Sequence, residues 1–179
     1  MRKYLFALLV LVAAGSTLFV AAFAAADGGS NKISAKDGLE GYQETPSVST
    51  IAGGSFEAKV AEDGLSFDWT LSYGGLEGNV TQAHIHFGQR SVNGGISIFL
   101  CSNLGNGPPG TQLCPPSPAT ITGTADEGDV VGPLPQGIEA GAFDEILSAI
   151  RAGKAYANVH SSKWTGGEIR GQLNDSNAK

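Results

Sequence analysis

Apolar and polar residues alternate along much of this chain, which is the pattern expected of β-strands that bury one face. The clearest example is residues 65–73, LSFDWTLSY, where every second residue from Leu65 to Tyr73 is large and apolar. Because successive side chains of a strand point to opposite faces, this segment predicts a half-buried antiparallel strand. Residues 55–60 and 80–88 alternate in the same way and are predicted strands as well.

Four further short segments complete a mostly β pattern. They are residues 95–100, 119–125, 154–161 and 167–173. Only residues 141–153, GAFDEILSAIRAG, have helical spacing, with apolar side chains at Phe143, Ile146, Leu147 and Ile150. The chain is therefore predicted to form a single antiparallel β-sandwich or barrel-like domain with one short helix.

The first 26 residues have the pattern of a segment that directs a protein to export. Arg2 and Lys3 precede a long apolar run, and small residues before Asp27 fit a cleavage site, so residues 1–26 are predicted to be a secretory signal peptide. The run also approaches the ~20 residues that span a bilayer, so an uncleaved N-terminal anchor is the alternative. In both cases the rest of the chain is expected to be secreted or extracytoplasmic, in the periplasm or at the cell surface.

The composition of the remaining chain suggests three segments, and its charge excludes two classes of partner. Residues 27–37 are polar and glycine-rich and predict a flexible lead-in, residues 38–173 form the predicted domain, and residues 174–179 predict a disordered tail. The formal net charge of −6 excludes nucleic acid and anionic membrane surfaces as main partners. Membrane contact is therefore expected only through an uncleaved N-terminal segment.

Cys101 and Cys114 are the only cysteines. In an oxidising compartment two cysteines most simply pair with each other. A disulfide closing this glycine- and proline-rich loop would contribute roughly 3 kcal/mol to stability in the chain-entropy picture. The alternative is a pair of free thiols in a reducing compartment.

All three histidines lie in predicted strands. His84 and His86 are two residues apart, so they project from one face of their strand about 6.5–7 Å apart. His160 shares a face with Asn158 on another strand. If the two strands are neighbours, the three imidazoles converge. Imidazole nitrogens suit zinc or copper, whereas calcium and magnesium prefer oxygen ligands.

Two other interpretations of the histidines stay open. They could form a structural network with side chains such as Gln82, Asn158 or Glu168, or take part in catalysis without a metal. The sequence has no Ser-His-Asp signature, phosphate loop or nucleotide-binding fingerprint. Nor does it offer a separate acid–base residue for a metalloenzyme.

Three segments carry a family resemblance. Residues 39–48, LEGYQETPSV, residues 74–100, GGLEGNVTQAHIHFGQRSVNGGISIFL, and residues 150–173, IRAGKAYANVHSSKWTGGEIRGQL, together resemble the CHRD domain found in chordin and in microbial exported proteins. The resemblance spans about residues 37–173. It implies a β-sandwich-like exported domain, which in chordin belongs to a secreted antagonist of growth factors. The chain departs from many members in its cysteine-bounded loop and in the serine that follows the last histidine.

The motif segments also contain three charged residues, Glu44, Glu168 and Arg170, to which the resemblance assigns no chemistry. Glu168 and Arg170 share a strand face and could form cross-strand ion pairs, and Arg170 could make a bidentate pair with Glu44. We interpret these three and Asn158 as structural residues. The alternative is that they support the histidines by orienting a ligand ring.

A weaker, local resemblance concerns residues 74–88, whose AHIHFG segment is similar to the copper-binding strand of copper/zinc superoxide dismutases. The zinc-loop ligands and catalytic arginine motif of those enzymes have no counterpart here. The sequence thus predicts an exported, non-catalytic binding module with a surface-accessible copper or zinc site at His84, His86 and His160. The alternatives are an extracellular protein–protein interaction module with structural histidines and a small superoxide dismutase-like metalloenzyme.

Overall fold

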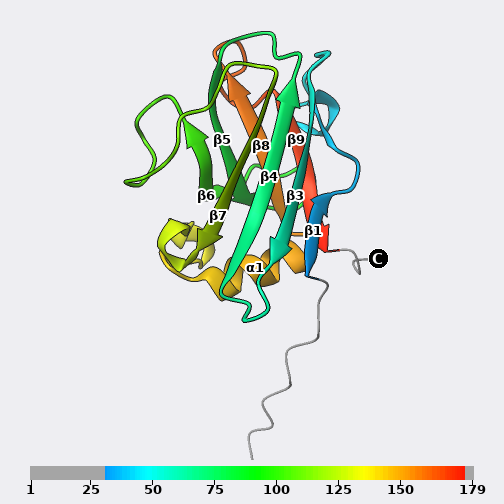
Figure 1. Cartoon of the computed structure of the whole chain (residues 1–179). Coiled ribbons are helices and arrows are strands. Elements are labelled where there is room, and N and C mark those ends of the chain that lie inside the picture. Colours follow the sequence, from blue (N-terminus) through cyan, green and yellow to red (C-terminus); the bar gives the residue numbers. More distant parts are fainter. Residues whose placement is uncertain (1–30, 176–179) are drawn as a thin grey trace, which may run out of the picture.

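A computed structural model describes residues 31–175, which form one antiparallel sheet and a single α-helix (Figure 1). The strands are β1 (Lys32–Ala35), β2 (Leu39–Glu40), β3 (Gly53–Val60), β4 (Ser66–Gly74), β5 (Val80–Phe87), β6 (Gly95–Ser102), β7 (Ala119–Asp126), β8 (Ala155–Ser161) and β9 (Ile169–Asp175). The helices are α1 (Phe143–Arg151) and the 3-10 turns η1 (Gly41–Gln43), η2 (Glu127–Asp129) and η3 (Leu134–Gln136).

The strand order β6-β5-β8-β9-β1-β3-β4-β7 makes the sheet fold over onto itself. In Figure 1 the half formed by β6, β5, β8 and β9 lies behind the half formed by β7, β4, β3 and β1, and α1 closes the lower end. The short β2 pairs with both β3 and β9. This confirms the predicted mostly β, sandwich-like domain with one short helix.

The core between the two halves follows the alternation seen in the sequence. On β4, Phe67 and Leu71 are fully buried, and Ile85 of β5 and Ile146 of α1 pack into the same cluster. Removing such side chains from water is the main favourable term in folding. Leu65 was expected to share this pattern, but it precedes β4 in a turn and is exposed.

The ends of the ordered domain differ from the expected boundaries. Residues 27–37 were predicted to be a flexible lead-in, yet Lys32–Ala35 form β1, because Ile33 and Ala35 bury themselves while the backbone pairs with β3 and β9. At the other end β9 continues to Asp175, into the predicted tail.

The predicted signal peptide or anchor, residues 1–26, lies outside the described residues, as do residues 176–179. Within residues 31–175, no helix combines the length and apolarity needed to cross a bilayer.

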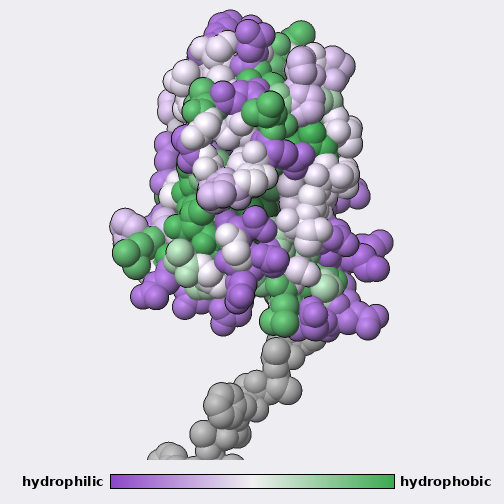
Figure 2. Space-filling view, turned by 60° about the vertical axis from the view of Figure 1, so that its left-hand side comes forward, coloured by the Kyte–Doolittle hydropathy of each residue, from purple (hydrophilic) through white to green (hydrophobic). Residues whose placement is uncertain are grey.

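The predicted disulfide between Cys101 and Cys114 is present and joins the end of β6 to the loop before β7. Asn103 closes the same loop, because its side chain donates to the Cys114 carbonyl and accepts from the Cys114 amide. Leu104 and Leu113 of this loop are exposed. On the side of the molecule formed by β6 and β7, apolar and polar residues are interspersed (Figure 2).

Candidate metal centre

The three histidines converge because β5 and β8 are neighbours in the sheet. Residues that pair across two antiparallel strands lie side by side on the same face. The intervening residues, Ile85 and Val159 among them, point to the core. The pairs on the polar face are Gln82 with His160, His84 with Asn158 and His86 with Tyr156.

The rings are close enough to bind one ion together. Each histidine offers a nitrogen, and the three nitrogens lie within 4.8 Å of one another. His84 Nδ1 and His160 Nε2 are 3.3 Å apart, within hydrogen-bonding distance of each other. The three residues are only 0–7% exposed. The sequence predicted a surface-accessible site, but the structure shows a buried cluster, because the loops around the polar face cover the three rings.

Backbone carbonyls fix which nitrogen of each ring is free. His86 Nδ1 donates to the carbonyl of Gly94 and His160 Nδ1 to the carbonyl of Thr165, both at 3.0 Å. Because a carbonyl can only accept, each of these rings carries its lone pair on Nε2. This arrangement, a ligand histidine oriented by a hydrogen bond on its other nitrogen, is typical of metal sites.

Two ring nitrogens of the cluster, one on His84 and one on His86, have no hydrogen-bond partner. With His160 Nε2 as an acceptor, His84 donates to it through Nδ1, which leaves the lone pair of His84 on Nε2. His84 Nε2 and His86 Nε2 are buried and accept no hydrogen bond. Leaving a buried polar atom unpaired costs about 1–3 kcal/mol, and a bound cation would remove that cost.

The environment keeps the three rings neutral. Burial, together with repulsion from His160 and His86, lowers the pKa of His84 to about 2. Burial lowers the pKa of His86 to about 4, and it also lowers the pKa of His160. Since metal ligands must be deprotonated, the lone pairs are available well below the pH at which exposed histidines protonate.

The family of this chain is shown by comparison with known proteins. The family model described as the CHRD domain matches residues 37–173, which is most of the chain. The chain belongs to the CHRD domain family. No curated protein and no solved structure matches it. CHRD membership and the disulfide indicate an extracellular protein.

Aromatic rings that sequence reasoning missed surround the histidines of this CHRD domain. Tyr156 stacks on His86 with ring centroids 4.8 Å apart, and Phe99 of β6 packs edge-on against His84 at 4.5 Å. The Tyr156 hydroxyl also accepts from the amide of Gly94. Alternation on β8 could have revealed Tyr156, because it lies two and four residues before Asn158 and His160.

The loop formed by residues 88–94 covers the polar face and is held by Arg170 of β9. The guanidinium Nη2 donates to the carbonyls of Val92 at 2.7 Å and Gln89 at 3.1 Å. Its Cζ also lies 3.4 Å from the centre of the Tyr156 ring. Arg170 is 1% exposed, so one buried cation links the loop to the ring that stacks on His86.

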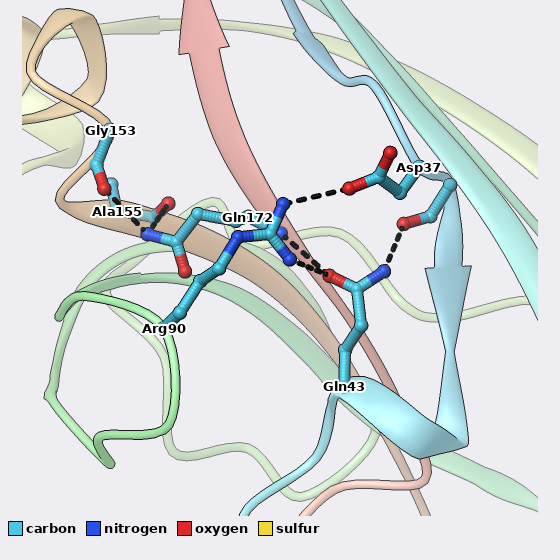
Figure 3. A network of polar contacts seen from close by, with 7 residues as sticks. Asp37, Gln43, Arg90, Gly153, Ala155 and Gln172 are labelled. Carbon is cyan, nitrogen blue, oxygen red and sulfur yellow. Dashed lines mark hydrogen bonds and ion pairs between the residues drawn. The ribbon is translucent and has the colours of Figure 1, made fainter.

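A second network ties the same loop to η1 and to β9 (Figure 3). Arg90 forms an exposed ion pair with Asp37 at 2.7 Å and donates to the Gln43 amide oxygen. The backbone amide of Gln172 donates to the same oxygen. The Gln172 side-chain nitrogen lies within hydrogen-bonding distance of the carbonyls of Gly88, Gly153 and Ala155. These contacts hold the covering loop closed over the CHRD polar face.

The four polar residues singled out in the motif segments lie around the histidines without bonding to them. Asn158 donates to Glu44 Oε1 at 2.5 Å and to the Ile169 carbonyl at 2.9 Å. The hydrogen bonds of Arg170 go mainly to the covering loop, and the described ion pairs do not include the expected pair with Glu44.

Glu168 accepts hydrogen bonds from two other loops. Its Oε1 accepts from the Thr50 hydroxyl at 2.9 Å and from the Glu77 amide at 2.8 Å. Its Oε2 is buried without a partner. Among the described residues, Glu168 and Arg170 do not form the ion pair that the sequence suggested. Within residues 31–175, the ring nitrogens of the histidines bond to one another and to carbonyls, not to Asn158, Glu168 or Gln82.

Glu44 makes the stability of the domain depend on pH. Burial raises its pKa to about 7 from an ordinary value of 4.5, although the Asn158 hydrogen bond and the attraction of Arg170 act in the opposite direction. The folded protein thus holds this proton more tightly than the unfolded chain. Stability from this group is complete below about pH 4.5 and is lost as pH rises through 7.

Glu44→Gln removes this titration and keeps an oxygen that can accept from Asn158. We expect the variant to gain stability relative to wild type between pH 4.5 and 7.5, by up to about 3 kcal/mol at 1.36 kcal/mol per pKa unit. Urea denaturation across this range measures the difference. The exposed Glu57→Gln on β3 is the matched control and should follow the wild-type pH profile. A constant difference between Glu44→Gln and wild type would contradict the prediction.

Proposed function

We propose that this CHRD protein is an exported binding module that holds one copper or zinc ion on His84, His86 and His160. The observation that supports this most is the pair of buried, unpartnered Nε2 lone pairs within a cluster of three convergent imidazoles. A structural histidine network would be expected to satisfy those atoms. A metal ion satisfies them directly.

The donor set decides the kind of ion. Three neutral nitrogens suit zinc and copper, and the described cluster contains no carboxylate of the kind that calcium or magnesium needs. Three protein ligands leave one position of a tetrahedral ion for a further ligand. No described carboxylate hydrogen-bonds to the rings, so no acid–base residue is placed to assist turnover. We therefore propose binding rather than catalysis.

Metal content tests this proposal directly. Protein purified without a histidine tag should bind one equivalent of zinc or copper per chain, with a Kd of about 1 µM or tighter, or roughly −8 kcal/mol. Elemental analysis and titration of the metal-free protein measure both quantities. Lys59→Ala, on the exposed side of β3, is the control and should bind equally well. Wild-type protein that takes up neither metal would refute the proposal.

One observation favours a second function, an extracellular protein-interaction module with structural histidines. His86 and His160 anchor the backbone at Gly94 and Thr165 through their Nδ1 atoms, which is useful without a metal. In that case, substituting the histidines would lower stability but leave a titration with zinc or copper flat for both wild type and variant. The same titration therefore separates the two functions.

A further inference from the structure

The charge balance of the three-histidine site is unusual for a divalent ion. Within the described residues the ligand cluster contains only His84, His86 and His160, and all three are neutral imidazoles. Both cysteines are in the disulfide, so neither offers a thiolate. An ion bound here would keep its full charge, because the described ligands contribute none of the opposite sign.

The surroundings add positive charge. The Arg170 guanidinium lies against Tyr156, which in turn stacks on His86, so a buried cation is one ring away from a ligand. The nearby carboxylates of Glu44 and Glu168 are directed at Asn158, Thr50 and Glu77 instead.

Burial makes this charge balance matter. His84 has no exposed surface and packs against Phe99, so little water can screen an ion there. Taking a charge out of water without a counter-charge costs several kcal/mol per ion in real proteins. The electrostatic cost rises steeply with the charge on the ion. A singly charged ion is therefore favoured over a doubly charged one.

We infer that the site selects Cu(I) over Cu(II) and Zn(II). This inference rests on the proposed function, because it requires the three histidines to bind a metal. Cu(I) carries one charge and is satisfied by two or three nitrogen ligands, which is what the cluster offers. We expect Cu(I) to bind about 1000-fold more tightly than Cu(II), a difference of about 4 kcal/mol. The potential of bound copper should then lie about 180 mV above that of the aqueous ion, at 59 mV per tenfold.

Competition titrations test the selection. Tag-free protein is titrated anaerobically with Cu(I) against a Cu(I)-specific chelator, and separately with Cu(II) and Zn(II) against chelators for divalent ions. A Kd for Cu(I) at least 100-fold below both others supports the inference. Comparable or tighter binding of Cu(II) or Zn(II) overturns it and leaves the proposed metal function standing. Absence of binding by all three ions overturns both.

Gln82→Glu tests the charge argument without altering a ligand. Gln82 pairs with His160 across the strands and lies two residues before His84, on the same face and partly exposed. A carboxylate here should strengthen Cu(II) and Zn(II) binding at least tenfold more than Cu(I) binding. Lys59→Gln, which changes the net charge by the same amount on the outer face, should leave the ratio unchanged. An equal ratio in Gln82→Glu and wild type would overturn charge as the cause.

Discussion

Replacing His84 and His86 by alanine should abolish stoichiometric zinc and copper binding and raise the Kd at least 1000-fold. The double variant leaves His160 as the only imidazole of the chain, and a single nitrogen does not hold these ions against water. The loss should be nearly complete because the described residues offer no fourth ligand in the cluster. Titration of the metal-free protein, with wild type in parallel, measures it.

A second variant separates loss of ligands from loss of fold. His84→Phe replaces one ring by another of similar size, and removes an unpartnered buried Nε2. The substitution also leaves His160 Nε2 without its donor, which costs about 1–3 kcal/mol, while the ring packing against Phe99 is kept. His84→Phe should therefore stay folded by circular dichroism and still lose at least 100-fold in metal affinity. A folded His84→Phe with wild-type affinity would show that His84 is not a ligand.

Arg170→Ala should lower the free energy of unfolding by about 3–5 kcal/mol. The substitution leaves the buried carbonyls of Gln89 and Val92 without their donor and removes the packing of the side chain on Tyr156. Affinity for the metal should also fall about 10–100-fold, because the loop it holds ends at Gly94, whose carbonyl orients His86. Urea denaturation and metal titration measure the two effects.

Two control variants make this test specific. Arg90→Ala removes an arginine from the covering loop itself, but its ion pair with Asp37 is largely exposed and should contribute less than about 1 kcal/mol. Arg170→Lys keeps the charge, but its single nitrogen cannot also serve the Thr45 and Asn93 oxygens that Nη1 reaches, nor lay a planar group on Tyr156, so most of the loss should remain. Equal stability losses in Arg90→Ala and Arg170→Ala would argue against the role of the buried guanidinium.

Alternation along the chain predicted the strands and which face each histidine occupies. It placed His84 and His86 on one side and His160 with Asn158 on one side of another strand, because the side-chain period of a strand is fixed. It could not establish that β5 and β8 are neighbours, since strand order depends on contacts between distant residues. The convergence of His160 with the other two is therefore a result of the structure.

Other features were missed because they depend on tertiary contacts. β1 is four residues long and lies in a polar context, so Ile33 gave no visible pattern until its partners β3 and β9 were known. The position of Phe99 opposite His84 follows from register shifts between β5 and β6 that alternation does not encode. The cover over the polar face comes from loops, whose paths are set by bonds such as those of Arg170.

If the histidine site binds an ion as proposed, the closed cover over β5 and β8 also governs how fast that ion arrives and leaves. Because the three imidazoles are almost wholly enclosed, we expect exchange of such an ion to require the 88–94 loop to detach from Arg170 and Gln172 first. Residence time would then be set by the frequency of that opening rather than by bond strength alone. If the site binds a metal as proposed, slow opening would let the protein retain the ion through dilution.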